Sequence, residues 1–229
     1  MDSFDQYVVG LTSHWAQQSV LLNKIIIQLL SLPTFKTLPL FALLWLLWFS
    51  VNETENRHAI LEGFVAMFIA GALSRAIQDA LPERVRPLHA GDPAFIPPLG
   101  ITPEDTVLEH WSSFPSDHAA VYFALSTALW LLSKRLGLAA YTWSLLVICM
   151  PRIFAGYHYA SDVIGGAVIG VVVASFIAPI IAGKLAPFVR AAEKRSKGPF
   201  YAGFFVLSFQ FLTMFNDLRI AASALKKFI

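Results

Sequence analysis

The chain has 229 residues, of which 56% are hydrophobic and 14% are charged, and its net charge is +2. Soluble domains carry about 25% charged residues, so this composition excludes a disordered chain and predicts one membrane-embedded domain over residues 1–229. The near-neutral charge, without a dense basic tract, indicates no nucleic-acid partner, and the single cysteine, Cys149, excludes an intramolecular disulfide and a cysteine-based metal site.

The first 35 residues predict an amphipathic helical region. Apolar residues recur at helical spacing with polar residues between them: Leu11, Trp15, Leu22, Ile25, Ile26 and Leu29 against Gln17, Asn23, Lys24 and Gln28. Such a pattern suits a helix that lies in the plane of the membrane interface. A seventh spanning helix of poor apolarity is the alternative.

Six apolar runs follow, and each predicts a membrane-spanning helix. A span needs ~20 mostly apolar residues, and flanking charged side chains can extend a slightly short run to the interface. The runs cover residues 37–52, 59–74, 119–133, 136–151, 163–183 and 198–216. The predicted fold is therefore all-α: an integral membrane six-helix bundle over residues 36–217, preceded by an N-terminal amphipathic interfacial helix.

The loops between these runs predict the orientation of the bundle. Short loops rich in lysine and arginine lie on the cytoplasmic side, which places residues 133–137 and 184–198 there. A long loop at residues 81–113, with six prolines, then lies outside, and loops of this length are usually functional or disordered. The C-terminal tail, with Arg219, Lys226 and Lys227, also falls outside, against the rule.

Six spans place several polar helix ends on the same side of the membrane. These ends are residues 75–79, 116–118 and 152–158, together with Asp162. Ionisable residues beside a span are costly and are functional candidates by default. We therefore expect two arginines, two histidines and one carboxylate to converge: Arg86, Arg152, His118, His158 and Asp162.

Two histidines in this set suit acid–base and nucleophilic chemistry. Asp162 follows His158 by four residues and can hold one nitrogen of its ring, which leaves the other nitrogen as a nucleophile. His118 can protonate a leaving oxygen.

The remaining groups suit a phosphate. Ser116 is a good N-cap for the third span, and a helix N-terminus binds phosphate. Arg86 and Arg152 can clamp phosphate oxygens in bidentate fashion. Arginines and helix N–H groups would carry the electrostatic role, so we expect neither a cofactor nor a metal.

Three motifs occur in order along the chain. They are Arg86-Pro87, then residues 115–118 with the sequence Pro-Ser-Asp-His, then Pro151-Arg152 followed by His158 and Asp162. On these motifs the sequence resembles the type 2 phosphatidic acid phosphatase superfamily, which includes soluble acid phosphatases and vanadium haloperoxidases. The resemblance implies that His158 is the nucleophile, held by Asp162, and that His118 is the general acid. It also implies that Arg86, Arg152 and Ser116 bind the phosphate.

The sequence departs from the family pattern at three positions. Asp79 stands where the family has a phosphate-binding lysine, and either Arg75 or Arg84 can supply that charge. Asp117 replaces a glycine, and we expect it to cap the helix or to complement the helix dipole. Pro151 replaces a serine. These changes bear on rate and substrate preference more than on the class of reaction.

Glycines around the motifs have structural explanations. Gly165, Gly166 and Gly170 predict close helix packing near the site. Gly156 predicts the turn that presents His158.

The resemblance implies an integral membrane lipid phosphatase in the bacterial inner (plasma) membrane, with its active site on the outer, periplasmic face. Its partners would be the bilayer and a membrane lipid phosphate, with undecaprenyl diphosphate slightly ahead of phosphatidic acid and phosphatidylglycerol phosphate. A lipid phosphotransferase with the same site is one alternative, and a weakly active lipid-binding or transport protein is another. Haloperoxidase activity is more distant, because it does not require six spans. The sequence leaves the oligomeric state open.

Overall fold

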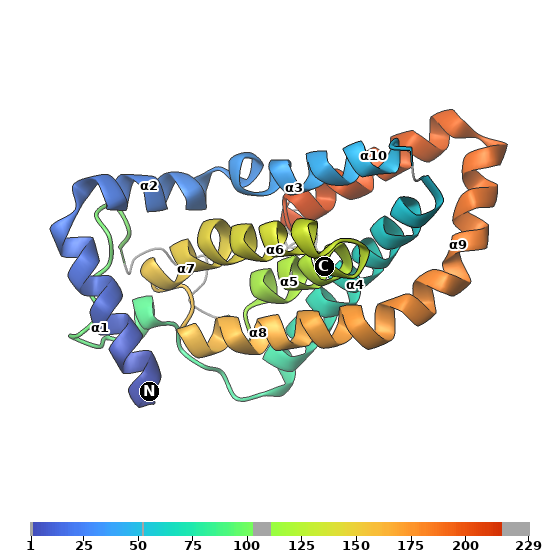
Figure 1. Ribbon diagram of the computed structural model, residues 1–229. Helices are drawn as coiled ribbons and strands as arrows, with labels where there is room; N and C mark the ends of the chain where they lie inside the picture. Colours follow the sequence, from blue (N-terminus) through green and yellow to red (C-terminus); the bar gives the residue numbers. More distant parts are fainter. Residues whose placement is uncertain (1, 52, 103–110, 217–229) are drawn as a thin grey trace, which may run out of the picture.

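The computed structural model describes residues 2–51, 53–102 and 111–216, and these are all-helical (Figure 1). Part of the predicted outer loop, with Glu104, Asp105 and Glu109, lies outside the described residues, and so does the tail with Arg219, Lys226 and Lys227. The helices, in chain order, are α1 (Ser3–Gln18), α2 (Val20–Ser31), α3 (Pro33–Trp48), α4 (Glu53–Ala80), η1 (Pro87–His89), α5 (Asp117–Leu132), α6 (Lys134–Trp143), η3 (Ser144–Cys149), α7 (Met150–Phe154), α8 (Ala160–Val172), η4 (Val173–Ile177), α9 (Ala178–Arg195) and α10 (Lys197–Leu212).

The N-terminal region forms two helices, where the sequence predicted one. Ser19 has an extended backbone, and its hydroxyl accepts a hydrogen bond of 3.1 Å from the backbone N–H of Leu22, which begins α2. Asn23 then donates to the carbonyl of Ala16 at 2.8 Å and fixes the angle between the helices. Because α1 packs against α7 and α8, its buried face contacts protein.

Three described helices are long and apolar enough to cross a membrane: Thr54–Ala80, Lys134–Phe154 and Ala160–Arg195. The pair Val20–Ser31 and Phe35–Trp48, bent by 53°, would make a fourth span. The predicted runs at residues 119–133 and 198–216 lie in α5 and α10, and each of these helices has only 16 residues. A span usually needs ~17–25 residues, so the count of six stays a prediction.

The outer faces of the long helices are apolar. Phe68 on α4, Phe176 on η4, Phe188 on α9 and Phe205 on α10 are each more than 60% exposed. Soluble monomers rarely expose large contiguous apolar surfaces, whereas lipid-facing helices do. With the long apolar helices, these faces identify the chain as an integral membrane protein.

Helix α5 is the centre of the bundle and packs against α4, α6 and α8 (Figure 1). Most of its residues from His118 to Leu129 are buried. Close packing of α5 on α8 depends on two glycines, as predicted: a Cβ on Gly166 would lie 2.2 Å from the carbonyl oxygen of Ser116, and one on Gly170 would lie 2.4 Å from that of Ala120. This crossing brings the N-termini of α5 and α8 together.

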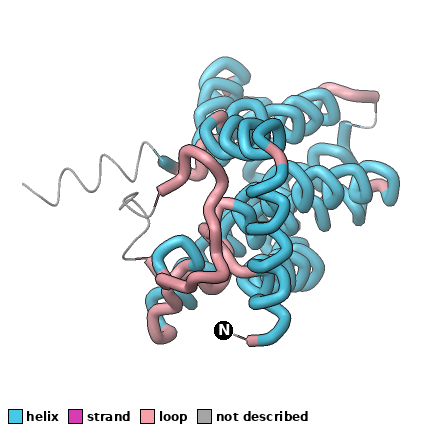
Figure 2. Tube along the Cα trace, turned by 90° about the vertical axis from the view of Figure 1, so that its left-hand side faces the viewer, coloured by secondary structure: helices cyan, strands magenta, loops and turns pink. Residues whose placement is uncertain are grey.

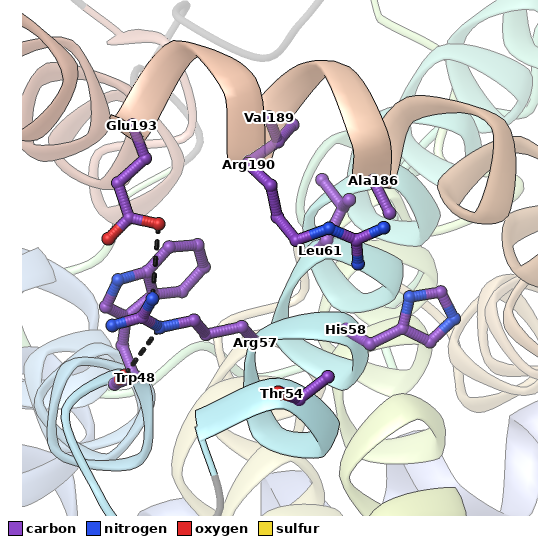
Figure 3. Close-up of a pocket in the computed structure, with 9 residues that line it drawn as sticks. All are labelled: Trp48, Thr54, Arg57, His58, Leu61, Ala186, Val189, Arg190 and Glu193. Atoms are coloured by element: carbon purple, nitrogen blue, oxygen red, sulfur yellow. Dashed lines mark hydrogen bonds and ion pairs between the residues drawn. The ribbon is translucent and has the colours of Figure 1, made fainter. Parts of the chain in front are cut away.

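The two ends of the bundle differ in structure. Loops gather at the end where α1 and the α7–α8 turn lie, and Figure 2 shows them from that side. At the opposite end, Arg57 of α4 pairs with Glu193 of α9 at 3.2 Å and donates to the carbonyl of Trp48 at 3.1 Å. Figure 3 shows the small pocket beside this ion pair, between α4 and α9. The ion pair fixes α9 against α4.

Candidate active site

The turn between α7 and α8 presents His158. Gly156 has a φ of 71°, a conformation that favours glycine, and its carbonyl accepts from the backbone N–H of Leu88 at 3.0 Å. A Cβ at this position would lie 2.4 Å from the ring of Phe95. The predicted turn at Gly156 is therefore confirmed, and it ties His158 to the loop that follows α4.

A backbone carbonyl fixes the tautomer of His158. The ring is 1% exposed, and its Nδ1 lies 2.8 Å from the carbonyl oxygen of Ser113. A carbonyl only accepts, so Nδ1 carries the hydrogen and Nε2 carries the lone pair. Burial lowers the pKa of His158 below its ordinary value, with Arg86 and Arg152 adding to this effect, which keeps the ring neutral at pH 7.

Asp162 lies beside His158 but is held mainly by other groups. Its Oδ2 is 3.8 Å from Nδ1 of His158, which is beyond hydrogen-bond distance. That oxygen accepts from the backbone N–H of Tyr159 at 2.7 Å, and Oδ1 accepts from Arg84 at 2.6 Å. The expected direct hydrogen bond to His158 is thus replaced by a carbonyl bond, and Asp162 closes the first turn of α8.

Asp5 is a site residue that sequence reasoning missed. It is fully buried, and its Oδ2 pairs with Arg84 at 2.7 Å. Ser161 donates to the same carboxylate from its backbone N–H at 3.0 Å and from its hydroxyl at 2.6 Å. One signal could have found it: Asp5 occupies the same helical register as the buried Val9 and Ala16 of α1.

The guanidinium of Arg84 is bound by two carboxylates, Asp5 and Asp162, and lies 4.4 Å from the ring centroid of Tyr159. It is therefore a bridge between α1 and α8. Arg84 is one of the two arginines predicted to replace the lysine of the family pattern. In the structure its charge is already paired with these two carboxylates.

The residues around His158 form one group, and a chain of four side chains around His118 forms a second group. Nη2 of Arg152 lies 2.5 Å from Nε2 of His118, and Nδ1 of His118 lies 2.9 Å from Oδ1 of Asp117. Oδ2 of Asp117 then pairs with Nη2 of Arg75 at 3.2 Å. An arginine only donates, so Nε2 of His118 accepts and its Nδ1 donates.

Ser116 joins the two groups. Its hydroxyl accepts from the backbone N–H of Ala119 at 3.4 Å, so it is the N-cap of α5 as predicted. Its own backbone N–H donates to the carbonyl of Asp162 at 3.0 Å. Asp117 is consequently not the cap; it lies in the first turn of α5 and accepts from the backbone N–H of His118 at 2.8 Å.

Arg86 clamps the loops around His158. It is 5% exposed and donates to the carbonyls of Trp111 at 3.1 Å, of Ser112 at 3.3 Å and of Tyr157. Burial lowers the pKa of Arg86 to about 10, so it stays charged at neutral pH. Three of its five N–H groups thus position the backbone on either side of His158.

Lys36 is a second residue that sequence reasoning missed. It lies near the start of α3, is 6% exposed and donates to the carbonyl of Leu30 at 3.1 Å. It is close enough to Arg152 and His118 to interact with both electrostatically. An even number of predicted spans separates residue 36 from the other polar helix ends, and this spacing is the signal that could have placed it at the same end.

The arrangement can bind an anion and transfer a group to a histidine. Nε of Arg152 is buried and has no hydrogen-bond partner among the described residues. A buried donor left unpaired costs about 1–3 kcal/mol, which an anionic ligand would remove. In the part of the chain that the structure describes, no cluster of three His, Cys, Asp or Glu side chains could hold a metal ion.

Comparisons with known proteins place these residues in a family. A family model described as the PAP2 superfamily matches residues 64–185, a range that contains every predicted site residue but neither Asp5 nor Lys36. The bacitracin transport permease protein BcrC of Bacillus licheniformis is 29% identical over 130 residues. That alignment covers 55% of this chain and 57% of the relative, so the chain spans less than two thirds of the relative's length. No solved structure matches the chain.

Proposed function

The chain belongs to the PAP2 superfamily, and from this premise we propose its function. We propose that the protein is an integral membrane lipid phosphatase. It hydrolyses a lipid phosphate or diphosphate through a phosphohistidine and needs no metal. The observation that carries the proposal is the pairing of a buried, neutral His158, with its lone pair on Nε2, and a buried Arg152 whose Nε awaits an acceptor.

The first step forms a bond between phosphorus and Nε2 of His158. Arg152 turns its N–H groups to the phosphate oxygens, and Arg86 and Ser116 support the same group. The bond from phosphorus to the leaving oxygen breaks, which is the ester oxygen of a lipid monophosphate or the bridging oxygen of a lipid diphosphate. His118, protonated on Nε2, gives its proton to that oxygen, and the lipid alcohol or the lipid monophosphate leaves.

The second step returns the enzyme to its starting state. A water molecule attacks phosphorus, the bond to Nε2 of His158 breaks, and His118 accepts a proton from the water. Inorganic phosphate leaves. The cations at this end, Arg152, Arg86 and Lys36, stabilise the charge that builds up on the phosphate oxygens in both steps.

The membrane setting supports a proposal for the substrate and its location. We place six spans over residues 36–217 of a bacterial inner membrane, with the site on the outer face, where basic loops are few. Undecaprenyl diphosphate is our first choice, followed by phosphatidic acid and phosphatidylglycerol phosphate. The lipid tail would lie along the apolar outer faces of the helices.

Two other functions use the same site. A lipid phosphotransferase would pass the phosphate from His158 to a hydroxyl group of a lipid or sugar. A lipid-binding or transport protein is the second. It is favoured by the relative BcrC, which is named a bacitracin transport permease protein, and by the replacements at Asp79, Asp117 and Pro151.

Phosphate release by detergent-purified protein in EDTA tests the proposal. Wild type, His158→Ala and His58→Ala are offered the three lipids side by side; His58 lies at the opposite end of α4 and pairs with Glu62 at 3.1 Å. We expect release by wild type and His58→Ala and its loss in His158→Ala. A phosphorylated acceptor formed without release of inorganic phosphate would favour the transferase, and no loss of phosphate from any lipid would favour transport.

A further inference from the structure

Asp117 stands where the family pattern has glycine, and it receives two hydrogen bonds from a single residue. Its Oδ1 accepts from the backbone N–H of His118 at 2.8 Å and from Nδ1 of the same residue at 2.9 Å. These two bonds fix the ring of His118 relative to its own backbone. They also direct Nε2 toward Arg152, where the phosphate would bind.

The carboxylate of Asp117 is itself held by a second set of contacts. Nη2 of Arg75 lies 3.2 Å from its Oδ2, and Nη1 of Arg75 donates to Gln78 at 2.7 Å. The guanidinium of Arg75 is centred 4.0 Å from the ring centroid of Trp111. Gln78 in turn donates to the carbonyl of Pro115 at 2.7 Å, just before α5. The orientation of Asp117 is therefore set by α4.

We propose that Asp117 is a positioning residue for His118, and that Arg75 acts through Asp117 and not on the phosphate. This inference rests on the proposed function, in which His118 is the acid toward the leaving oxygen. An anion on Nδ1 holds the tautomer and stabilises the imidazolium that forms when Nε2 takes up a proton. The same anion would repel phosphate if it faced the substrate, so its bonds to His118 and Arg75 are what make it tolerable here.

The two departures from the family pattern are then one coupled exchange. Asp79 and Arg75 are four residues apart and share a face of α4. Compared with the family pattern, the cation lies one helical turn earlier on α4, at Arg75. A carboxylate stands at residue 117, where the family has glycine, and pairs with this arginine. In this arrangement Arg75 orients Asp117, Asp117 orients His118, and Arg152 and Lys36 remain for the phosphate.

Leaving-group dependence tests the role of Asp117. An alkoxide leaves only with a proton, whereas p-nitrophenolate leaves as a stable anion, so only the first needs His118. We expect Asp117→Asn and Asp117→Gly to lower kcat/KM for an alkyl phosphate monoester on the order of 10–100-fold, part of the 10²–10⁴-fold that a general acid contributes. For p-nitrophenyl phosphate we expect less than about a threefold loss, since the acid is not needed there.

Two further variants calibrate this test. His118→Ala should show the same pattern with a larger loss, and Asp79→Asn, the same chemical change at an exposed position of α4, should leave both substrates unaffected. Equal losses for the two substrates in the Asp117 variants would indicate a purely structural role, and no loss for either would show that Asp117 is not needed. Both results overturn the proposal.

A double-mutant cycle tests the role of Arg75. If Arg75 acts through Asp117, Arg75→Ala lowers kcat/KM for the alkyl ester in wild type but adds little to Asp117→Gly. Inhibition by vanadate, a phosphate mimic, should be unchanged in Arg75→Ala. A tenfold or greater weakening of vanadate inhibition in both backgrounds would show that Arg75 binds the phosphate directly.

The tautomer of His118 provides a measurement that does not depend on turnover. Because Arg152 also donates to Nε2 of His118, this measurement uses ¹⁵N-histidine-labelled protein that carries Arg152→Ala. In that background we expect His118 to carry its hydrogen on Nδ1, and we expect the addition of Asp117→Gly to abolish this preference. An unchanged tautomer in the double variant overturns the proposal even if no lipid is hydrolysed. Absence of phosphate release by the wild-type protein, by contrast, would count against the proposed function alone.

Discussion

At the scale of single residues, the hydrogen bond from His158 to the carbonyl of Ser113 has a functional consequence. A carboxylate stabilises the charged form of a histidine that it holds more strongly than a neutral carbonyl does. Asp162 is 3.8 Å away and its charge is shared with Arg84. The site therefore keeps His158 neutral, as a nucleophile requires, and leaves Asp162 to shape the start of α8.

These contacts predict how His158 titrates. Burial lowers its pKa, Arg86 and Arg152 lower it further, and Asp162 and Asp117 oppose them. In the proposed function the neutral ring is the nucleophile, so we expect activity above this lowered pKa and its loss as the pH falls through it. We expect NMR titration of ¹⁵N-histidine-labelled protein, assigned with His158→Ala, to place the midpoint below about 6.5, the ordinary value for histidine. A midpoint at or above that value would contradict the prediction.

At the scale of helices, the crossing of α5 and α8 holds the start of α5, where His118 lies, beside the start of α8, which follows His158. A Cβ on Gly170 would lie 2.4 Å from the carbonyl oxygen of Ala120 and 2.7 Å from the backbone nitrogen of Ala124, and neither backbone atom can move aside alone. Widening this crossing would separate Ser116 from Asp162, whose backbone groups are bonded at 3.0 Å.

We therefore expect Gly170→Ala to destabilise the protein by about 1–3 kcal/mol or more, as other overpacked cores are destabilised. The matched control is Gly183→Ala on α9, where a Cβ meets nothing within 4 Å. Alanine favours a helix over glycine by roughly 0.5–1 kcal/mol, so the control should hold or raise the melting temperature. Thermal unfolding in detergent compares the two. A melting temperature for Gly170→Ala at or above wild type would show that the crossing tolerates a methyl group.

The contact of α1 with the site depends on Asp5. Asp5→Asn removes the charge that faces Arg84. Breaking a buried ion pair costs about 3–5 kcal/mol of stability. We expect a smaller loss here, because Arg84 is 30% exposed and keeps its ion pair with Asp162. We expect faster hydrogen exchange of the α1 amides and a severalfold lower rate of phosphate release.

Asp2→Asn is the control for this change. Asp2 caps the same helix by accepting from the backbone N–H of Asp5 at 2.8 Å, and asparagine caps a helix equally well. Its exchange and activity should match wild type. If Asp5→Asn behaves like Asp2→Asn, α1 is held by its apolar contacts alone.

The parts of this site that the sequence predicts depend on local backbone requirements or on the alternation of predicted spans across the membrane. Ser116 as the N-cap and Gly156 as a left-handed turn follow from local backbone requirements. The approach of Arg152 to His118 follows from an even number of spans between their helix ends.

The parts that the sequence does not predict depend on where separate helices approach one another. Asp5 meets Arg84 across 79 residues, and nothing local to either residue indicates the pairing. The apolar run at residues 119–133 resembles a lipid-facing span, but it is the buried centre of the bundle, because apolar composition does not distinguish protein contact from lipid contact. The break at Ser19 needed one capping hydroxyl within an otherwise continuous pattern.

At the scale of the whole molecule, the two ends of the bundle must face different compartments. The site end carries the loop at residues 81–102, which the hydroxyl of Ser13 holds to α1 by accepting from the backbone N–H of Ile96 at 3.0 Å. The opposite end carries the basic segment at residues 184–198, fixed by the pair of Arg57 and Glu193 (Figure 3). Basic segments stay on the cytoplasmic side, so the site should face outward.

Labelling of single cysteines tests this orientation. Cys149 is buried and is the single cysteine of the chain, so Cys149→Ala gives a cysteine-free background. Ala94, in the site-end loop, and Ser196, between α9 and α10, are both exposed. In intact bacterial cells, a membrane-impermeant maleimide should label Ala94→Cys at once and Ser196→Cys only after the cells are permeabilised. The reverse pattern would place the site in the cytoplasm. A substrate delivered from outside would then be excluded, because the lipid phosphate would have to reach His158 from the inner leaflet.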